Sequence, residues 1–193
     1  MFGVVSNMSD IAILKEMLKD SVTVTLEPNP YDIIKNQVTL QEPDYAVIIA
    51  GMPAESEVVV IKTDAFISPN AVFKNSKHEC KRADFVIIAN TNNHKVIICI
   101  ELKARSTTSK EQEIIQQLKG AKCFVAYCQE IGKMFWEDNS FLNNYDYRYV
   151  SIRNIGISLK PSRNKKEPIH DQPEKMLKIS SPHHLQFKYL TGS

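Results

Sequence analysis

Apolar residues in this chain gather into short runs separated by polar, turn-forming segments, and each run predicts one element. The run that follows Ser9-Asp10 has near-helical spacing and predicts a helix over 10–19. Alternating or continuous apolar runs then predict strands over 21–26, 45–50, 58–61, 85–88 and 96–100. The first hundred residues therefore predict a helix followed by several strands of a sheet.

The second half of the chain begins with a capping box, in which Ser109 and Gln112 predict the start of a helix that Gly120 ends. A strand over Cys123–Tyr127 is predicted next. Less regular patterns predict a helix over 131–136, strands within 147–159 and an edge strand over 185–190. We expect a single α/β domain over 1–159, followed by a basic, proline-containing loop and C-terminal extension over 160–193.

The composition is that of an ordinary globular domain, with 43% hydrophobic and 24% charged residues in 193. A formal net charge of +2 argues against a protein that coats nucleic acid nonspecifically. The four cysteines include no CxxC pair, which argues against a zinc site and indicates reduced thiols. Neither a signal peptide nor a membrane-spanning run is expected, and the predicted location is cytoplasmic.

The most informative chemistry lies in two neighbouring apolar runs. Asp84 opens the first run, and Glu101 and Lys103 follow the second. The polar tract between the runs is rich in turn formers, so the two runs predict an antiparallel hairpin with all three charged residues at one end. Such a cluster is costly to build without a use. It suits a divalent cation that activates water for attack on a phosphodiester.

This pattern resembles the PD-(D/E)XK nuclease superfamily. The matching residues are Asp84, the tripeptide Glu101-x-Lys103 and a following helix that carries Gln117, within residues 73–130. Ala83 stands where the family usually has proline. The resemblance implies a restriction-endonuclease-like core, with a central mixed β-sheet flanked by helices in the order αβββαβ. It also implies hydrolysis of DNA with Mg²⁺, for which Mn²⁺ can substitute.

The resemblance also assigns roles within the motif. Asp84, Glu101 and the backbone carbonyl of Leu102 are expected to bind the metal, and Lys103 to position or activate the water. Gln117 is expected to support the site, although Gln116 beside it is an alternative by helix phase.

Members of the family often take a further acidic ligand from a helix before the first core strand. Glu16 is the candidate here, with Glu55 and Glu57 as alternatives.

Contact with nucleic acid is predicted through the basic approach to Asp84. Residues 74–82 hold four basic side chains against one acidic one, and Lys77, Lys81 and Arg82 are the expected phosphate contacts. No membrane partner is expected. Candidate assemblies are a homodimer or a subunit of a larger defence or repair complex.

Two other interpretations remain open. The chain can be a catalytically inactive nuclease-fold module that binds nucleic acid or a partner protein. It can also be an unrelated α/β domain in which Asp84, Glu101 and Lys103 form a structural cluster of ion pairs.

Overall fold

A computed structural model describes residues 8–30, 32–67, 69–92, 94–103, 110–153 and 169–192. Within these ranges the chain forms the helices α1 (Asp10–Met17), α2 (Glu111–Phe135) and α3 (Phe187–Thr191). One sheet has five strands in the order β4 (Val58–Lys62), β5 (Phe85–Asn90), β6 (Lys95–Lys103), β7 (Asp146–Arg153) and β8 (Leu177–Ser180). A second sheet has four, in the order β1 (Glu27–Asn29), β2 (Asp32–Glu42), β3 (Tyr45–Met52) and β9 (His184–Gln186).

Both sheets are mixed, which confirms the predicted α/β class. In the first sheet β4, β5 and β6 are antiparallel, while β7 runs parallel to β6 and β8 parallel to β7. In the second sheet β9 pairs parallel to β3, beside antiparallel pairs. No helix in the described ranges combines the length and apolar character that crossing a bilayer requires.

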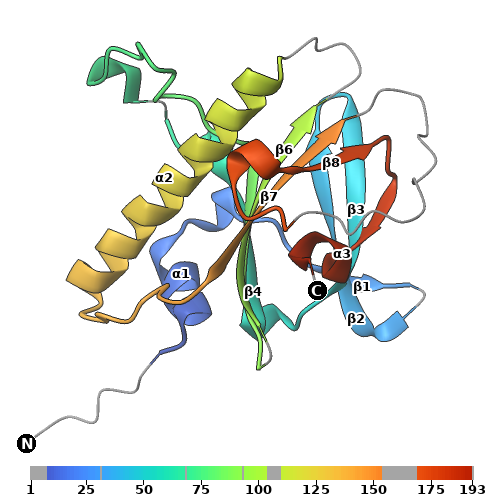
Figure 1. Ribbon diagram of the computed structural model, residues 1–193. Helices are drawn as coiled ribbons and strands as arrows, with labels where there is room; N and C mark the ends of the chain where they lie inside the picture. Colours follow the sequence, from blue (N-terminus) through green and yellow to red (C-terminus); the bar gives the residue numbers. More distant parts are fainter. Residues whose placement is uncertain are drawn as a thin grey trace, which may run out of the picture.

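The five-stranded sheet is the middle layer of the molecule. Helices α1 and α2 cover one of its faces, and the hairpin of β2 and β3 lies on the other (Figure 1). Side chains alternate between these faces, so Val86 and Cys99 pack beneath the helices, whereas Phe85 and Ile100 pack against the second sheet. Two apolar layers result, which explains why β5 and β6 read as continuous apolar runs.

The hairpin predicted over 84–103 is confirmed, as is the N-terminal helix. Strand β5 pairs antiparallel with β6, with Phe85 opposite Ile100. Helix α1 begins where predicted, because the side chain of Ser9 accepts a hydrogen bond from the backbone N–H of Ala12 (3.2 Å).

The predicted end of the second helix at Gly120 and the predicted strand over Cys123–Tyr127 are wrong. Helix α2 runs without interruption through both, and the predicted helix over 131–136 is its last part. A Cβ at position 120 would overlap the carbonyl oxygen of Lys81, and one at Gly132 would overlap the ring of Phe141. Both glycines therefore permit close packing against the helix, and neither ends it.

Other differences lie in the flanking segments. The predicted strand over 21–26 is a 3₁₀ turn, Asp20–Val22, followed by an isolated bridge from Thr23 to Ile61. Strand β2 was not predicted. The edge strand predicted over 185–190 is correct only for β9, since α3 begins at Phe187.

The C-terminal part supplies strands to both sheets, β8 beside β7 and β9 beside β3. The 3₁₀ turns not yet placed are η2 (Glu55–Glu57), η3 (Thr63–Ala65), η4 (Pro69–Ala71) and η5 (Pro173–Lys175). Ser109, the predicted helix cap, and residues 154–168, which include most of the basic loop, lie outside the described residues. Among the described residues, Lys110 occupies the N-cap of α2, and its side chain makes no capping hydrogen bond.

Candidate functional site

Asp84 and Glu101 meet at the open end of the β5–β6 hairpin. They are the next pair beyond Phe85 and Ile100 in the antiparallel register, so their side chains lie on the same face. An oxygen of Asp84 accepts a hydrogen bond from the backbone N–H of Leu102 (2.7 Å). Glu101 is fully buried, with 0% of its surface exposed, and Asp84 is half-buried.

Lys103 completes the cluster on the same face, two residues after Glu101. Its ammonium forms an ion pair with Glu101 Oε1. Since Val86 and Cys99 point toward α2, alternation along the strands puts Asp84, Glu101 and Lys103 on that side also. The structure thus brings together the three residues that the sequence singled out.

Burial controls the protonation of these carboxyl groups. It raises the pKa of Glu101 to about 8, with the charge of Asp84 adding to the effect and that of Lys103 opposing it. Burial likewise raises the pKa of Asp84 to about 6, against the hydrogen bond from Leu102 and the charge of Lys103. For Lys103, burial disfavours the charged form, but Glu101 and other nearby carboxylates raise its pKa above the ordinary value.

Glu101 also holds an oxygen without a partner. Its Oε2 is buried and accepts no hydrogen bond from any residue that the structure describes. An unsatisfied buried carboxylate is costly, since most buried polar atoms in folded proteins have a hydrogen-bond partner. This oxygen therefore requires an explanation, such as a ligand that it binds.

Leu102 offers a backbone oxygen to the same place. In an extended strand the N–H and C=O of one residue point to the same edge. Because the N–H of Leu102 donates to Asp84, its carbonyl lies on the Asp84 side of β6. This placement is compatible with the ligand role that the resemblance implies.

Gln117 lies on the inner side of α2, between Ile114 and Ala121, which are both buried against the sheet. Its Oε1 is buried and has no hydrogen-bond partner among the described residues. Its amide oxygen therefore makes no hydrogen bond to the Asp84 cluster, although Gln117 follows Glu113 by one turn on the same side of the helix.

Glu113 was not predicted as a site residue. Its carboxylate forms an ion pair with Lys81 (2.5 Å) and lies near enough to Lys103 to help raise the pKa of that lysine. The first turn of α2 therefore borders the site.

Two other carboxylates near the site were missed by the sequence analysis. Glu42 ends β2 in the second sheet, where burial and then the charges of Asp84 and Asp64 raise its pKa to about 7. Asp64 lies just after β4, in a turn whose Thr63 N–H donates to the carbonyl of Asp84 (2.9 Å). Since β4 and β5 are antiparallel, the acid after β4 was predictable from the argument that found Asp84. Glu42 was not, because it comes from another sheet.

Glu16 is not brought to this cluster, contrary to expectation. Its carboxylate accepts a hydrogen bond from the indole N–H of Trp136, which caps the C-terminal end of α2 (3.2 Å). The Asp84 cluster lies near the other end of that helix, and a helix of 25 residues spans about 37 Å.

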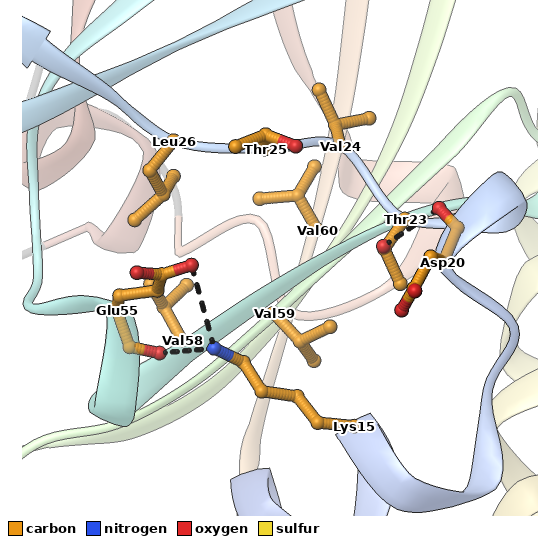
Figure 2. Close-up of a pocket in the computed structure, with 10 residues that line it drawn as sticks. All are labelled: Lys15, Asp20, Thr23, Val24, Thr25, Leu26, Glu55, Val58, Val59 and Val60. Carbon is orange, nitrogen blue, oxygen red and sulfur yellow. Dashed lines mark hydrogen bonds and ion pairs between the residues drawn. The ribbon is translucent and has the colours of Figure 1, made fainter.

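The alternatives Glu55 and Glu57 also lie away from the cluster. Both precede β4, whose opposite end, Lys62, is the one that pairs with Phe85. Figure 2 shows Glu55 and Lys15 in contact beside a pocket of about 230 Å³ that both line, where the lysine ammonium donates to the backbone carbonyl of Glu55 (2.7 Å).

The predicted nucleic-acid contacts differ in their surroundings. Lys77 is exposed, whereas Lys81 is held by Glu113, and the guanidinium of Arg82 lies 5.0 Å from the ring centre of Phe66. All three belong to the connecting segment (residues 69–82), which leads from η4 toward β5 and packs against α2 (Figure 1).

The ligand set suits a hard divalent cation that keeps much of its water. Within the described residues, no three His, Cys, Asp or Glu side chains are grouped closely enough to hold a metal by themselves. Mg²⁺ is commonly bound by one or two carboxylates, with water and substrate phosphate completing its octahedron. Asp84, Glu101 and the Leu102 carbonyl offer only oxygen atoms, and one of them is buried without a partner, so these residues fit such an ion.

Comparison with known proteins leaves the site to be interpreted from its own geometry. A scan against protein-family models, a search of curated proteins and a search of solved structures each found no match to this chain.

Proposed function

We propose that this protein is a Mg²⁺-dependent nuclease that hydrolyses phosphodiester bonds in DNA. The observation that carries the proposal is Glu101, a fully buried carboxylate with an unbonded oxygen, beside Asp84 and in an ion pair with Lys103. A structural cluster would normally satisfy that oxygen. A metal site leaves it available.

The order of elements supports a restriction-endonuclease-like core. Strands β1, β2 and β3 of the second sheet lie between α1 and β4 along the chain. With these set aside, α1, β4, β5, β6, α2 and β7 follow the order αβββαβ that the resemblance to PD-(D/E)XK nucleases implies. The strands β4, β5 and β6 form an antiparallel meander, and β7 lies parallel beside β6. The predicted strand over Cys123–Tyr127 is replaced in this order by β7, reached after a longer helix.

Asp84, Glu101 and the Leu102 carbonyl would hold the cation, which when bound supplies positive charge and lowers the pKa of water in its coordination shell. Glu101 must lose its proton first. Because burial raises its pKa to about 8, cation affinity should increase as the pH rises from 6 to 8.

Lys103 has the charge and position to act on the phosphate. Its raised pKa keeps the ammonium charged at neutral pH, next to the carboxylates that would bind the cation. An ammonium in a partly dry site stabilises negative charge that develops on a phosphate more strongly than it would in water. Gln117 would act as a positioning residue, with its unbonded amide oxygen available to a water or to the substrate.

The alternative is an inactive nuclease-fold module that binds nucleic acid or a partner protein. The presence of all three charged residues in one cluster favours the enzyme. An ammonium beside two carboxylates has a role in hydrolysis that binding of nucleic acid or a partner protein does not require.

Cleavage of labelled DNA in Mg²⁺ or Mn²⁺, with EDTA as the metal-free control, tests the proposal. Asp84→Asn, Glu101→Gln and Lys103→Ala should each reduce the rate by at least about 100-fold, as expected for groups that stabilise the transition state. Glu55→Gln is the matched control, since it removes an exposed acid at the opposite end of β4 and should cleave like wild type. Absence of cleavage by wild type, or equal rates in all variants, would overturn the assignment.

A further inference from the structure

An apolar pocket lies immediately beside the candidate site. It has a volume of about 510 Å³, within the range typical of ligand sites, about 300–1,000 Å³. The connecting segment and Phe66 form one wall, and the middle of α2 forms the other. Arg82, at its edge, precedes Asp84 by two residues, so their Cα atoms are within about 7 Å.

The pocket is built on a close contact between its two walls. Gly120 of α2 lies so near the carbonyl of Lys81 that no side chain fits there. The ion pair between Lys81 and Glu113 adds a second link between the connecting segment and the helix. The pocket is therefore part of the fold, and Glu113, which pairs with its lining residue Lys81, also lies near Lys103.

Aromatic side chains line the pocket and remain open to solvent. Phe73 and Tyr127 are 54% and 55% exposed, far more than packing alone would leave. The ring of Phe66 stands at 58° to that of Phe124 and at 48° to that of Tyr127, with ring centres 5.4 and 5.9 Å apart. Such tilted rings leave faces available to a flat ligand.

Cationic side chains border these rings. Lys81 and Arg82 line the pocket together with the acid Glu79, and Lys74 and Lys77 lie elsewhere in the same connecting segment. Rings that stack on a base, next to cations that contact its phosphate, form the usual site for single-stranded nucleic acid. In a duplex the faces of the bases are covered by their neighbours and cannot reach such rings.

We infer that this pocket holds an unpaired base of a single-stranded nucleic acid, and that the substrate of the adjacent site is a single strand or a single-stranded end. The inference about the substrate rests on the proposed nuclease function. The inference about base binding does not, and it can be tested without cleavage.

The binding test uses a fluorescent oligothymidylate of about 12 nucleotides, a length that OB-fold sites also cover, with EDTA present to prevent cleavage. Wild type should bind it about 10-fold more tightly than the matching duplex or the same strand without bases. Phe73→Ala and Tyr127→Ala should each weaken binding about 5- to 150-fold, the range expected for one lost stacking contact. Phe135→Ala is the control, an exposed ring of the same helix that does not line the pocket.

Cys123 gives a second readout that needs no variant. It is the exposed one of the four cysteines, all of which lie in described ranges, and it lines the pocket. Bound oligothymidylate should slow its alkylation by iodoacetamide, measured by mass spectrometry. Unchanged alkylation together with unchanged affinity in both ring variants would overturn the inference, as would protection by a nonionic detergent but not by the oligonucleotide.

The two proposals fail separately. If wild type cleaves DNA but shows neither a preference for unpaired bases nor protection of Cys123, the base pocket is wrong and the nuclease stands. If single strands bind and protect Cys123 but Mg²⁺ produces no cleavage, the nuclease is wrong and the base pocket stands.

Discussion

The two ends of strand β6 each carry a lysine that contacts a buried carboxylate, but the two carboxylates differ in their hydrogen-bond partners and neighbouring charges. At the first end Lys95 lies 3.8 Å from Asp10, and at the other end Lys103 forms an ion pair with Glu101. Asp10 is 8% exposed and Glu101 is 0% exposed. The comparison is therefore between two buried acids, Asp10 of α1 and Glu101 of β6, that lie at opposite ends of one strand.

Asp10 is fully bonded. One of its oxygens accepts a hydrogen bond from the hydroxyl of Tyr145 (2.8 Å), and the other accepts from the backbone N–H of Leu142 (3.4 Å). Burial, and then the Asp10 carboxylate, raise the pKa of Tyr145, which keeps the hydroxyl protonated as a donor. Asp10 thus fastens α1 to the segment that leads into β7.

Glu101 has other acidic residues near it instead. Apart from Lys103, its neighbours include Asp84 and Glu42, both of which raise its pKa. The difference teaches that burial alone does not identify a functional carboxylate. What distinguishes Glu101 is that its second oxygen has no donor and that Asp84 and Glu42 repel its charge, against the attraction of Lys103.

The largest expected effect on stability is at the bonded end. Asp10→Ala would leave the Tyr145 hydroxyl and the Leu142 N–H buried without an acceptor. We expect the free energy of unfolding to fall by about 3 kcal/mol, and the melting temperature by about 6–12 °C for a chain of this size.

Urea unfolding monitored by circular dichroism measures the change. The control is the single variant Tyr145→Phe, which removes the hydroxyl donor and leaves the Asp10 acceptor in place. That control should cost about 1 kcal/mol. If Asp10→Ala unfolds like wild type, the contrast between the two ends of β6 disappears.

The second prediction concerns the response to a cation. At a Mn²⁺ concentration of about 100 times its dissociation constant, wild type should gain about 2.7 kcal/mol of stability. Glu101→Gln should lose this gain because an amide is a poor ligand for the ion, and Asp10→Asn should keep it. Differential scanning calorimetry with and without Mn²⁺ measures the shift. A shift that persists in Glu101→Gln would place the cation elsewhere.

The third prediction is a pH dependence without metal. The carboxyl of Glu101 has a pKa of about 8 in the folded protein and 4.5 as its ordinary value. The protonated carboxyl contributes its full stability below about pH 4.5, and this contribution is lost as the pH rises from there through 8, because the unfolded carboxyl ionises while the folded one must keep its proton. Glu101→Gln has no such proton to lose, so at pH 9 it should be about 2 kcal/mol more stable than wild type.

Unfolding curves at several pH values measure this difference, which should shrink toward pH 5. Asp84 and Glu42 also have raised pKa values, but both remain in the variant, so only the difference between the two curves reports on Glu101. A variant that is less stable than wild type at pH 9 would show that Glu101 is held by favourable contacts, as Asp10 is.

The smallest expected effects come from the two lysines. Lys95→Ala removes a half-exposed ion pair and should alter stability by about 0.5 kcal/mol or less. Lys103→Ala should also lower the free energy of unfolding by less than about 1 kcal/mol, because Glu101 can take up a proton when the lysine ammonium is removed. The two variants differ in function, since only Lys103→Ala should lose cleavage. Parallel measurement of unfolding and cleavage separates the roles.

Much of the site could be predicted because its information is local. The hairpin follows from two apolar runs around a turn, and alternation along β6 puts Glu101 and Lys103 on one face. The antiparallel pairing then brings Asp84 opposite Glu101. None of these steps needs knowledge of distant parts of the chain.

Glycine shows where local reasoning fails. In sequence, Gly120 resembles a helix stop, but in the structure it marks the crossing of the connecting segment over α2. The same residue type serves both purposes, and only the position of Lys81 decides between them. The false strand over Cys123–Tyr127 followed from that error, because an apolar run of five residues fits a buried helix equally well.

The sequence by itself therefore determined the α/β class, the β5–β6 hairpin and the meeting of Asp84, Glu101 and Lys103. Only the tertiary structure decided that Glu42 borders the site, that Glu16 does not, and that α2 continues past Gly120 to form a wall of the aromatic pocket. The physical reason is the range of the interactions. Side-chain alternation acts between neighbouring residues, whereas the approach of Glu42 and the burial of Glu101 depend on how separate layers pack.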